Sequence, residues 1–174
     1  MCRVPEKSKD FFGCCLTAAS RLDDAGASSF TRFMPTRAII DTNVFLSALW
    51  SRQGAAYEIF ADLRREGWQI VLSNHLVFEY EEVAKRNAAR MGLTLEDVDD
   101  VLDTICAAAE QRQLEPAWVP RLSDPDDEPL LQLAVEAKVP LIVTRNIHHL
   151  KPAENFGIEL LSPAEFLAQL KKSK

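Results

Sequence analysis

Short apolar runs alternate along this chain with longer segments in which apolar residues recur at helical spacing. Residues 38–40 (Ala-Ile-Ile) and 141–143 (Leu-Ile-Val) contain no polar side chain, which is typical of strands covered on both faces of a parallel sheet. Strands that alternate with helices predict an α/β fold with a mostly parallel central sheet. The predicted strands cover residues 37–40, 69–72, 117–119, 140–144 and 158–161, and the predicted helices cover 44–49, 55–65, 74–90, 129–138 and 164–170, with a further helix beginning at 93–97.

The first 33 residues differ from the rest because they show no sustained hydrophobic period and no apolar core of a signal peptide. We therefore predict a flexible extension over residues 1–33 and one folded domain over residues 34–174. Met34 stands just before the first predicted strand, so the extension could reflect the choice of start codon. Mass spectrometry of the native N-terminus tests this hypothesis.

The composition, with 47% hydrophobic and 26% charged residues, is that of a soluble globular protein. No apolar run approaches the roughly 20 residues that cross a bilayer, so no membrane partner is expected. A formal net charge of −6 argues against a protein that holds nucleic acid through a basic surface alone. The four cysteines lack the spacing of a metal site or a disulfide framework, which favours reduced thiols in a cytoplasmic protein.

Three acidic residues occupy comparable positions in the predicted layout. Asp41 follows the first strand, Glu79 lies on the helix after the second strand, and Asp127 begins the helix before the fourth strand. The carboxyl ends of parallel strands share one edge, so these groups are expected to converge there. Taken alone, Asp41 or Asn43 could equally be a cap of the following helix.

Converging carboxylates repel one another unless a cation neutralises them. Oxygen ligands select hard divalent ions such as Mg²⁺ or Mn²⁺, which bind a phosphodiester and activate water for its hydrolysis. The three acids therefore favour metal-assisted phosphodiester hydrolysis.

Five short motifs in this order resemble those of the PIN domain family, specifically the VapC-like ribonuclease toxins of toxin–antitoxin modules. They are residues 40–44 (Ile-Asp-Thr-Asn-Val), 73–76 (Ser-Asn-His-Leu) leading to Glu79, 124–127 (Asp-Pro-Asp-Asp), 143–146 (Val-Thr-Arg-Asn) and 161–166 (Leu-Ser-Pro-Ala-Glu-Phe). The resemblance implies a three-layer α/β/α sandwich and a Mg²⁺- or Mn²⁺-dependent endoribonuclease. It also implies an RNA substrate, a cognate antitoxin protein and a homodimer.

By this resemblance, Asp41, Glu79 and Asp127 are the metal-binding and catalytic acids. Asn146 stands at the fourth acidic position and is expected to assist catalysis, while His149 stands where many members carry another Asp. An amide offers one neutral oxygen and no charge, so a second metal site is expected to be weaker. The residues expected to bind substrate or to support the acids are Asn43, Asp124, Asp126, Thr144, Arg145 and His149.

Two alternative functions remain open. Asn146 and His149 motivate a catalytically weak PIN module that binds RNA or a protein partner without cleaving it. A phosphatase or phosphotransferase with Asp41 as nucleophile is disfavoured, because such enzymes usually need a second Asp two residues later, where this chain has Asn43.

Overall fold

The computed structural model describes residues 35–63, 67–116, 118–122 and 124–172. The predicted extension over residues 1–33, together with Met34, lies outside the described residues. Within the described part of the chain, no helix combines the length and the hydrophobicity that crossing a membrane requires.

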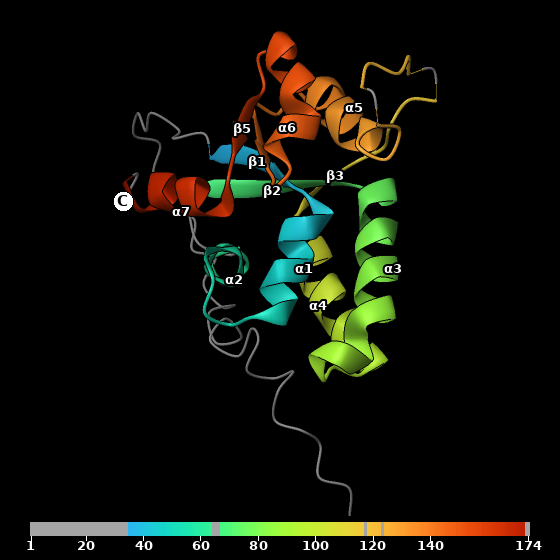
Figure 1. The fold of residues 1–174 in the computed structure, drawn as a ribbon, viewed down its shortest axis with the longest axis vertical. Coiled ribbons are helices and arrows are strands. Elements are labelled where there is room, and N and C mark those ends of the chain that lie inside the picture. The colour runs from blue at the N-terminus through green and yellow to red at the C-terminus, as the bar shows by residue number, and fades with distance from the viewer. Residues whose placement is uncertain (1–34, 64–66, 117, 123, 173–174) are drawn as a thin grey trace, which may run out of the picture.

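The described chain folds around one five-stranded sheet in which every strand is parallel to its neighbours, in the order β3-β2-β1-β4-β5. Helices α1 to α4 lie on one side of this sheet and α5 and α6 on the other, which gives three layers (Figure 1). The predicted α/β/α sandwich is therefore confirmed. The strands are β1 (Thr36–Ile40), β2 (Trp68–Ser73), β3 (Glu110–Arg112), β4 (Leu141–Val143) and β5 (Glu159–Leu161). The helices are α1 (Thr42–Trp50), α2 (Ala55–Ala61), α3 (Asn74–Met91), α4 (Leu95–Ala108), α5 (Glu128–Glu136), α6 (Ile147–Leu150), the 3-10 helix η1 (Lys151–Phe156) and α7 (Pro163–Lys172).

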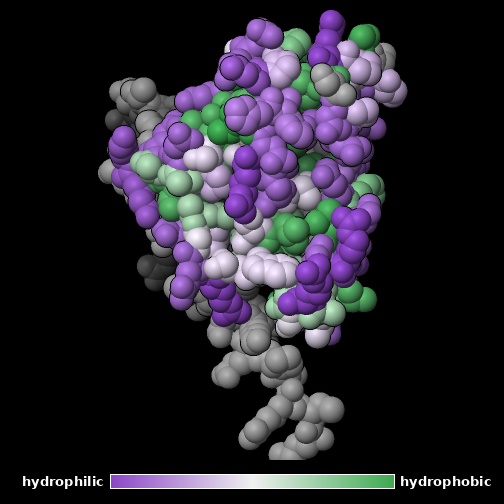
Figure 2. Space-filling view, viewed as in Figure 1, coloured by the Kyte–Doolittle hydropathy of each residue, from purple (hydrophilic) through white to green (hydrophobic). Residues whose placement is uncertain are grey.

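The central strand β1 is apolar because both of its faces are covered by helices. Ala38, Ile39 and Ile40 are completely buried, and Ile40 pairs with Val143 of β4. The last backbone bond along this pair joins the amide of Asp41 to the carbonyl of Val143 at 2.9 Å. The chain therefore leaves the sheet at Asp41, at the edge formed by the carboxyl ends of the strands. On the viewed face, hydrophilic residues cover most of the upper part, over α5 and α6 (Figure 2).

The predicted third strand over residues 117–119 is wrong. The third strand is instead β3, which pairs with β2 through Val71 and Glu110 at the edge of the sheet. β3 consists of polar residues (Glu-Gln-Arg), so it carries no hydrophobic signal. Trp118 and Val119 lie in a loop between two prolines, and residue 117 lies outside the described residues. Proline has no backbone N–H for a strand ladder, so this apolar segment packs as a loop.

An ion pair ties the unexpected edge strand to the centre of the sheet. Arg37 of β1 donates from Nε and Nη2 to the two carboxylate oxygens of Glu110 at 2.9 and 2.6 Å. Its Nη1 also donates to the carbonyl of Ala137, after α5, at 2.9 Å. Burial alone raises the pKa of Glu110, but the hydrogen bonds from Arg37 and Arg112 outweigh it and lower this pKa below its ordinary value of 4.5. The pair therefore stabilises the fold most when Glu110 is ionised.

Glu110→Gln is expected to lower the free energy of unfolding by about 1–2 kcal/mol at neutral pH, because it removes a partly shielded bidentate ion pair. Since folding lowers the pKa of Glu110, its contribution is complete above the ordinary value of 4.5 and is lost as pH falls through the folded pKa. Urea unfolding of both proteins at neutral and acidic pH measures the difference, which should shrink in acid. An equal difference at both pH values would contradict this account.

The helix boundaries follow capping signals in the sequence. Ser73 accepts a hydrogen bond from the Leu76 amide and begins α3, and Thr94 with Asp97 forms a complete capping box at the start of α4. The predicted helices are all present within a few residues of their expected ends. Cys106 is half-buried and is a free thiol.

Candidate active site

A cleft of about 360 Å³ opens at the carboxyl ends of β1 and β4, between α1, α3 and the loop that leads into α5. We call it the acidic cleft because most of its polar lining is carboxylate. Leu46, Val83 and Leu130 provide its apolar walls. The polar lining consists of Asp41, Thr42, Asn43, Glu79, Asp124, Asp126, Asp127, Asn146 and His149.

Asp41 is fixed by hydrogen bonds as it leaves β1. Its Oδ2 accepts hydrogen bonds from the Thr144 hydroxyl and the Asn43 side-chain amide, both at 2.5 Å, and its Oδ1 accepts one from the Asn43 backbone at 3.3 Å. Asp41 is also the N-cap of α1, so it caps the helix and lines the cleft at once. Burial raises the pKa of Asp41, although the bonds from Thr144 and Asn43 oppose this shift. Asp41, Asn43 and Thr144 therefore act as one rigid unit.

Glu79 reaches the cleft from the second turn of α3. Burial is the main cause of its raised pKa, and the negative charge of Asp41 adds to the shift. The Thr42 hydroxyl opposes the shift, although it forms no well-shaped hydrogen bond. The next residue, Tyr80, is completely buried, and its hydroxyl donates to the carbonyl of Ile40. This bond holds α3 against the end of β1, which places Glu79 opposite Asp41.

Asp127 is positioned by a buried anchor, Glu128, at the start of α5. The carboxylate of Glu128 accepts hydrogen bonds from the Trp118 indole at 2.8 Å and from the backbone amides of Arg121 and Leu122. Burial alone raises the pKa of Glu128, but these hydrogen bonds outweigh it and lower the pKa below its ordinary value. Glu128 thus fixes the loop that enters the cleft.

The Asp127 side chain has no comparable partner. Its Oδ2 is buried and accepts no hydrogen bond among the described residues, and Asp127 does not cap α5 with its side chain. Burial raises the pKa of Asp127, and the charges of Asp41 and Asp124 raise it further. An unsatisfied oxygen among repelling carboxylates is an arrangement that a bound cation would stabilise.

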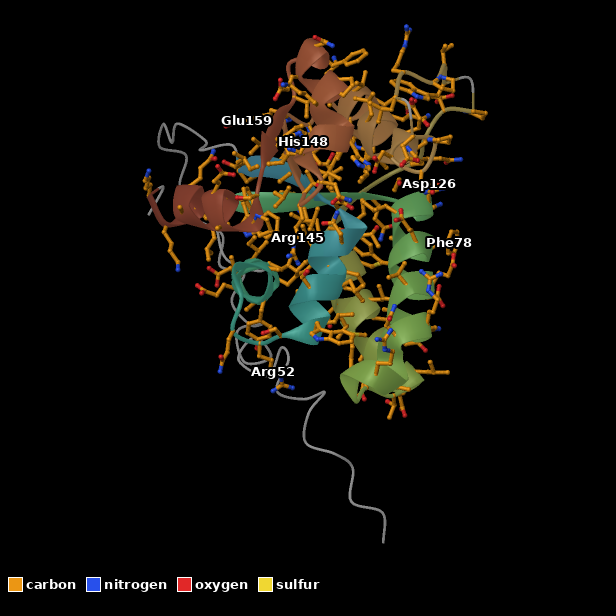
Figure 3. The ribbon with its side chains drawn as sticks, viewed as in Figure 1. Arg52, Phe78, Asp126, Arg145, His148 and Glu159 are labelled. Atoms are coloured by element: carbon orange, nitrogen blue, oxygen red, sulfur yellow. The ribbon has the colours of Figure 1, made fainter. Side chains whose placement is uncertain are left out.

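Asp124 and His149 lie beside Asp127 at the mouth of the cleft. His149 Nδ1 is 3.9 Å from Asp124 Oδ2 and 3.8 Å from Asp127 Oδ2. Asp124 Oδ1 also accepts a hydrogen bond from the Asp126 amide at 3.1 Å, so it forms the turn and lines the cleft. Asp126 is exposed at the rim above the start of α3 (Figure 3).

The structure brings Asn146 into the cleft lining but turns Arg145 away. Asn146 is exposed, and its backbone N–H donates to the Thr144 hydroxyl at 2.9 Å. Arg145 lies beside α1 (Figure 3), where its Nη1 donates to the Ser47 hydroxyl at 2.8 Å. It lines a neighbouring pocket of about 600 Å³ that also contains the exposed Trp50. Arg145 therefore borders the acidic cleft from outside.

Sequence reasoning missed three residues that shape the cleft. Thr42 lies inside the motif of residues 40–44, but nothing in that motif marks its hydroxyl as buried. Tyr80 and Glu128 each adjoin a predicted acid, yet nothing in the local pattern distinguishes a buried anchor from an ordinary helix residue. Both are buried through contacts with chain segments distant in sequence, which only the fold reveals.

The donor set in the cleft fits a divalent cation. Asp41, Glu79 and Asp127 come from three different elements. Burial raises the pKa of all three, and neighbouring negative charges add to the shift for Glu79 and Asp127. Their oxygens are hard ligands, as Mg²⁺ and Mn²⁺ prefer. The cleft therefore presents the kind of oxygen donors that such an ion binds.

Comparisons with known proteins agree with this architecture. A family model described as a PIN domain matches residues 37–148, which is more than half of the chain. The match runs from β1 to α6 and includes Asp41, Glu79 and Asp127. A search of curated proteins gives no match. PIN domains are generally nucleases and typically use divalent metal ions. The parallel sheet, the three layers and this match together show that the chain belongs to the PIN domain family.

Proposed function

We propose that this protein is a metal-dependent endoribonuclease that hydrolyses RNA phosphodiester bonds at the acidic cleft. The observation that supports this most is the convergence of Asp41, Glu79 and Asp127 from β1, α3 and the start of α5 on one cleft. Structural carboxylates usually have a cation or a set of donors as partners, whereas Asp127 Oδ2 has neither among the described residues. A cleft of this kind is suited to hold a cation and a phosphate together.

In this proposal Asp41, Glu79 and Asp127 hold a Mg²⁺ or Mn²⁺ ion. When bound, the ion polarises the scissile phosphate and lowers the pKa of the attacking water. Thr144 and Asn43 keep Asp41 in one orientation through their hydrogen bonds. Asn146 assists by presenting its amide to the phosphate from the rim of the cleft.

We assign to Glu79 the acceptance of a proton from the attacking water, because its carboxylate lines the cleft close enough to feel the charge of Asp41. Burial raises the pKa of Glu79 in the metal-free cleft, and a bound cation would lower it again, so the proton would go to the carboxylate oxygen that the cation leaves free. The apolar walls of Leu46, Val83 and Leu130 limit competing water around it. The leaving oxygen takes its proton from solvent water, and Glu79 releases its proton to solvent before the next turnover.

Arg145 is proposed to bind a phosphate of the RNA next to the one that is cleaved. It is exposed and borders the cleft, and no carboxylate pairs with it among the described residues. Because the net charge is −6, an RNA-binding face needs such a local cation.

Arg145→Ala is expected to raise the KM for RNA about fivefold with little change in kcat, because it removes roughly 1 kcal/mol of phosphate binding. The dependence of KM on salt should also become weaker, since one phosphate contact is lost. Steady-state cleavage at two salt concentrations measures both effects. Arg86→Ala is the matched control, because Arg86 is exposed on α3 and pairs with Glu82. Equal KM values for Arg145→Ala and the control would contradict the proposed role.

A second candidate function is a PIN module that binds RNA or a protein without cleaving it. The exposed amide of Asn146 at the fourth acidic position favours it, because an amide adds no charge to hold a cation. Such a module would bind RNA but release no products when supplied with divalent ions.

The remaining expectations from the resemblance are proposals of the same kind. We propose that the protein is the toxin of a toxin–antitoxin module, that it acts in the cytoplasm and that it forms a homodimer controlled by an antitoxin protein. Light scattering on the purified chain tests the dimer. Growth arrest on expression, and its relief by the product of a neighbouring gene, tests the module.

The proposed activity is tested by incubating pooled RNA with the wild type, Glu79→Gln and Glu82→Gln in Mn²⁺. Glu82 is the matched control because it lies one turn further along α3 and is exposed. The nuclease proposal expects cleavage by the wild type and by Glu82→Gln, and loss of cleavage by Glu79→Gln. Binding without cleavage by all three proteins would favour the second candidate.

A further inference from the structure

We propose that His149, Asp124 and Asp127 form a cation position with a nitrogen ligand, and that this position makes the cleft prefer transition-metal ions such as Mn²⁺ over Mg²⁺. The inference deepens the proposed function and rests on it, because Asp127 belongs both to this group and to the three converging acids. It concerns which ion is bound, whereas the proposed function concerns what the bound ion does.

The spacing of the three donor groups is that of ligands around one ion. One atom from each of Asp124, Asp127 and His149 lies within 4.8 Å of the others. His149 Nδ1 is 3.8 and 3.9 Å from the two carboxylate oxygens, which is too far for hydrogen bonds. With metal–ligand distances of about 2.1 Å, two ligands of one ion stand roughly 3 to 4.2 Å apart. The three side chains are thus separated as if to admit an ion between them.

Two buried polar atoms in the same cleft independently indicate a missing ligand. Asp127 Oδ2, one of the three donors, is buried and accepts no hydrogen bond among the described residues. Thr42 is only 6% exposed and lines the cleft, where its hydroxyl faces Glu79 but makes no well-formed hydrogen bond. Buried polar groups without well-formed hydrogen bonds are costly, so their presence together in a cleft of carboxylates points to an occupant with positive charge.

The imidazole determines the kind of ion. Mg²⁺ binds almost entirely through oxygen and keeps several waters, whereas imidazole binds readily to later divalent ions of the first transition row. Affinity for a site with nitrogen ligands therefore rises from Mn²⁺ towards Cu²⁺. His149 is 61% exposed at the side chain, so its ring is free to turn towards an ion. Its neighbour His148 is also exposed but does not line the cleft, which makes it a natural control.

The test uses the full chain, freed of metal by EDTA and desalting, and measures binding of Mn²⁺ and Mg²⁺ alone by titration calorimetry. The variants are His149→Ala, His149→Asp and the control His148→Ala. Pulsed electron paramagnetic resonance of bound Mn²⁺ then reports directly whether a ¹⁴N nucleus is a ligand. Thermal melting in EDTA confirms that each variant is folded.

We expect ¹⁴N coupling in the wild type and in His148→Ala, and its loss in His149→Ala. His149→Ala should also weaken Mn²⁺ binding at least about tenfold, the lower end of what loss of a supporting residue costs a metal site. His149→Asp should bind Mn²⁺ without ¹⁴N coupling. Its preference for Mn²⁺ over Mg²⁺ should be smaller than that of the wild type. Wild-type Mn²⁺ without ¹⁴N coupling, or unchanged Mn²⁺ affinity in His149→Ala, would overturn the inference.

These outcomes are distinct from a failure of the proposed function. A protein that binds Mn²⁺ through His149 but cleaves no RNA would refute the ribonuclease proposal alone. A protein that cleaves RNA in Mn²⁺ but shows no nitrogen ligand would refute the His149 position alone.

Discussion

Asp127→Asn is expected to abolish RNA cleavage and, at the same time, to raise the melting temperature of the metal-free protein. Activity falls because the amide no longer holds the cation, whose contribution of several kcal/mol corresponds to about 10²- to 10³-fold in rate. Stability rises because the pKa of Asp127 is raised by burial and by the charges of Asp41 and Asp124, so the ionised carboxylate is unfavourable in the folded state without a cation. The amide has the same shape and no charge.

Cleavage rates in Mn²⁺ and melting curves in EDTA measure the two effects. Asp100→Asn is the matched control, because Asp100 is exposed on α4 and outside the cleft. The control should change neither quantity. An Asp127→Asn protein that is both inactive and less stable in EDTA would mean that Asp127 supports the fold rather than a cation.

Tyr80→Ala is expected to lower the free energy of unfolding by about 3–5 kcal/mol, as does removal of other buried aromatic rings. The ring is completely buried and stacks on Phe45 at a centroid distance of 4.3 Å. Its hydroxyl also donates to the carbonyl of Ile40, the residue before Asp41. Tyr80→Phe keeps the ring and removes the hydrogen bond to this carbonyl, so a smaller loss of about 1–3 kcal/mol is expected. Urea unfolding measures both losses.

We expect the Tyr80 hydroxyl to affect the rate of RNA cleavage as well as the stability of the fold. Tyr80→Phe should slow RNA cleavage even at temperatures where the protein is fully folded, because the end of β1 is less firmly held against α3. Phe166→Leu is the matched core variant, since Phe166 is equally buried but packs on Trp68, away from the cleft. Equal cleavage rates for the two folded variants would show that the hydroxyl contributes to stability only.

The central strands and the converging acids could be predicted from the sequence because their signals are local. The apolar run 38–40 followed by Asp41 encodes both a buried strand and a group at its carboxyl end. The capping box of Thr94 and Asp97 likewise predicts the start of α4 from four consecutive residues. A parallel sheet then brings the ends of separate strands to one edge, so the placement of Glu79 and Asp127 follows from topology.

The edge strand and the cleft details could not be predicted because their causes are distant in sequence. β3 is polar and becomes a strand by pairing with β2, with its Glu110 bound to Arg37. Residues 118–119 look like a strand but pack as a loop, because the Trp118 indole donates to buried Glu128. Arg145 comes just after β4, at the edge of the sheet where the acids gather. Its side chain nevertheless donates a hydrogen bond to Ser47 and lines a neighbouring pocket.

The most direct test of a cation-dependent ribonuclease is whether removing the metal stops RNA cleavage and restoring it brings cleavage back, with one protein preparation and one RNA pool. Purified wild type is given RNA with Mn²⁺, then excess EDTA, then excess Mn²⁺, and the products are followed at each stage beside Asp41→Asn from the same purification. We predict that cleavage stops in EDTA and resumes when Mn²⁺ is restored, and that Asp41→Asn cleaves at no stage. Cleavage that persists in EDTA, or equal cleavage by Asp41→Asn, would contradict the account.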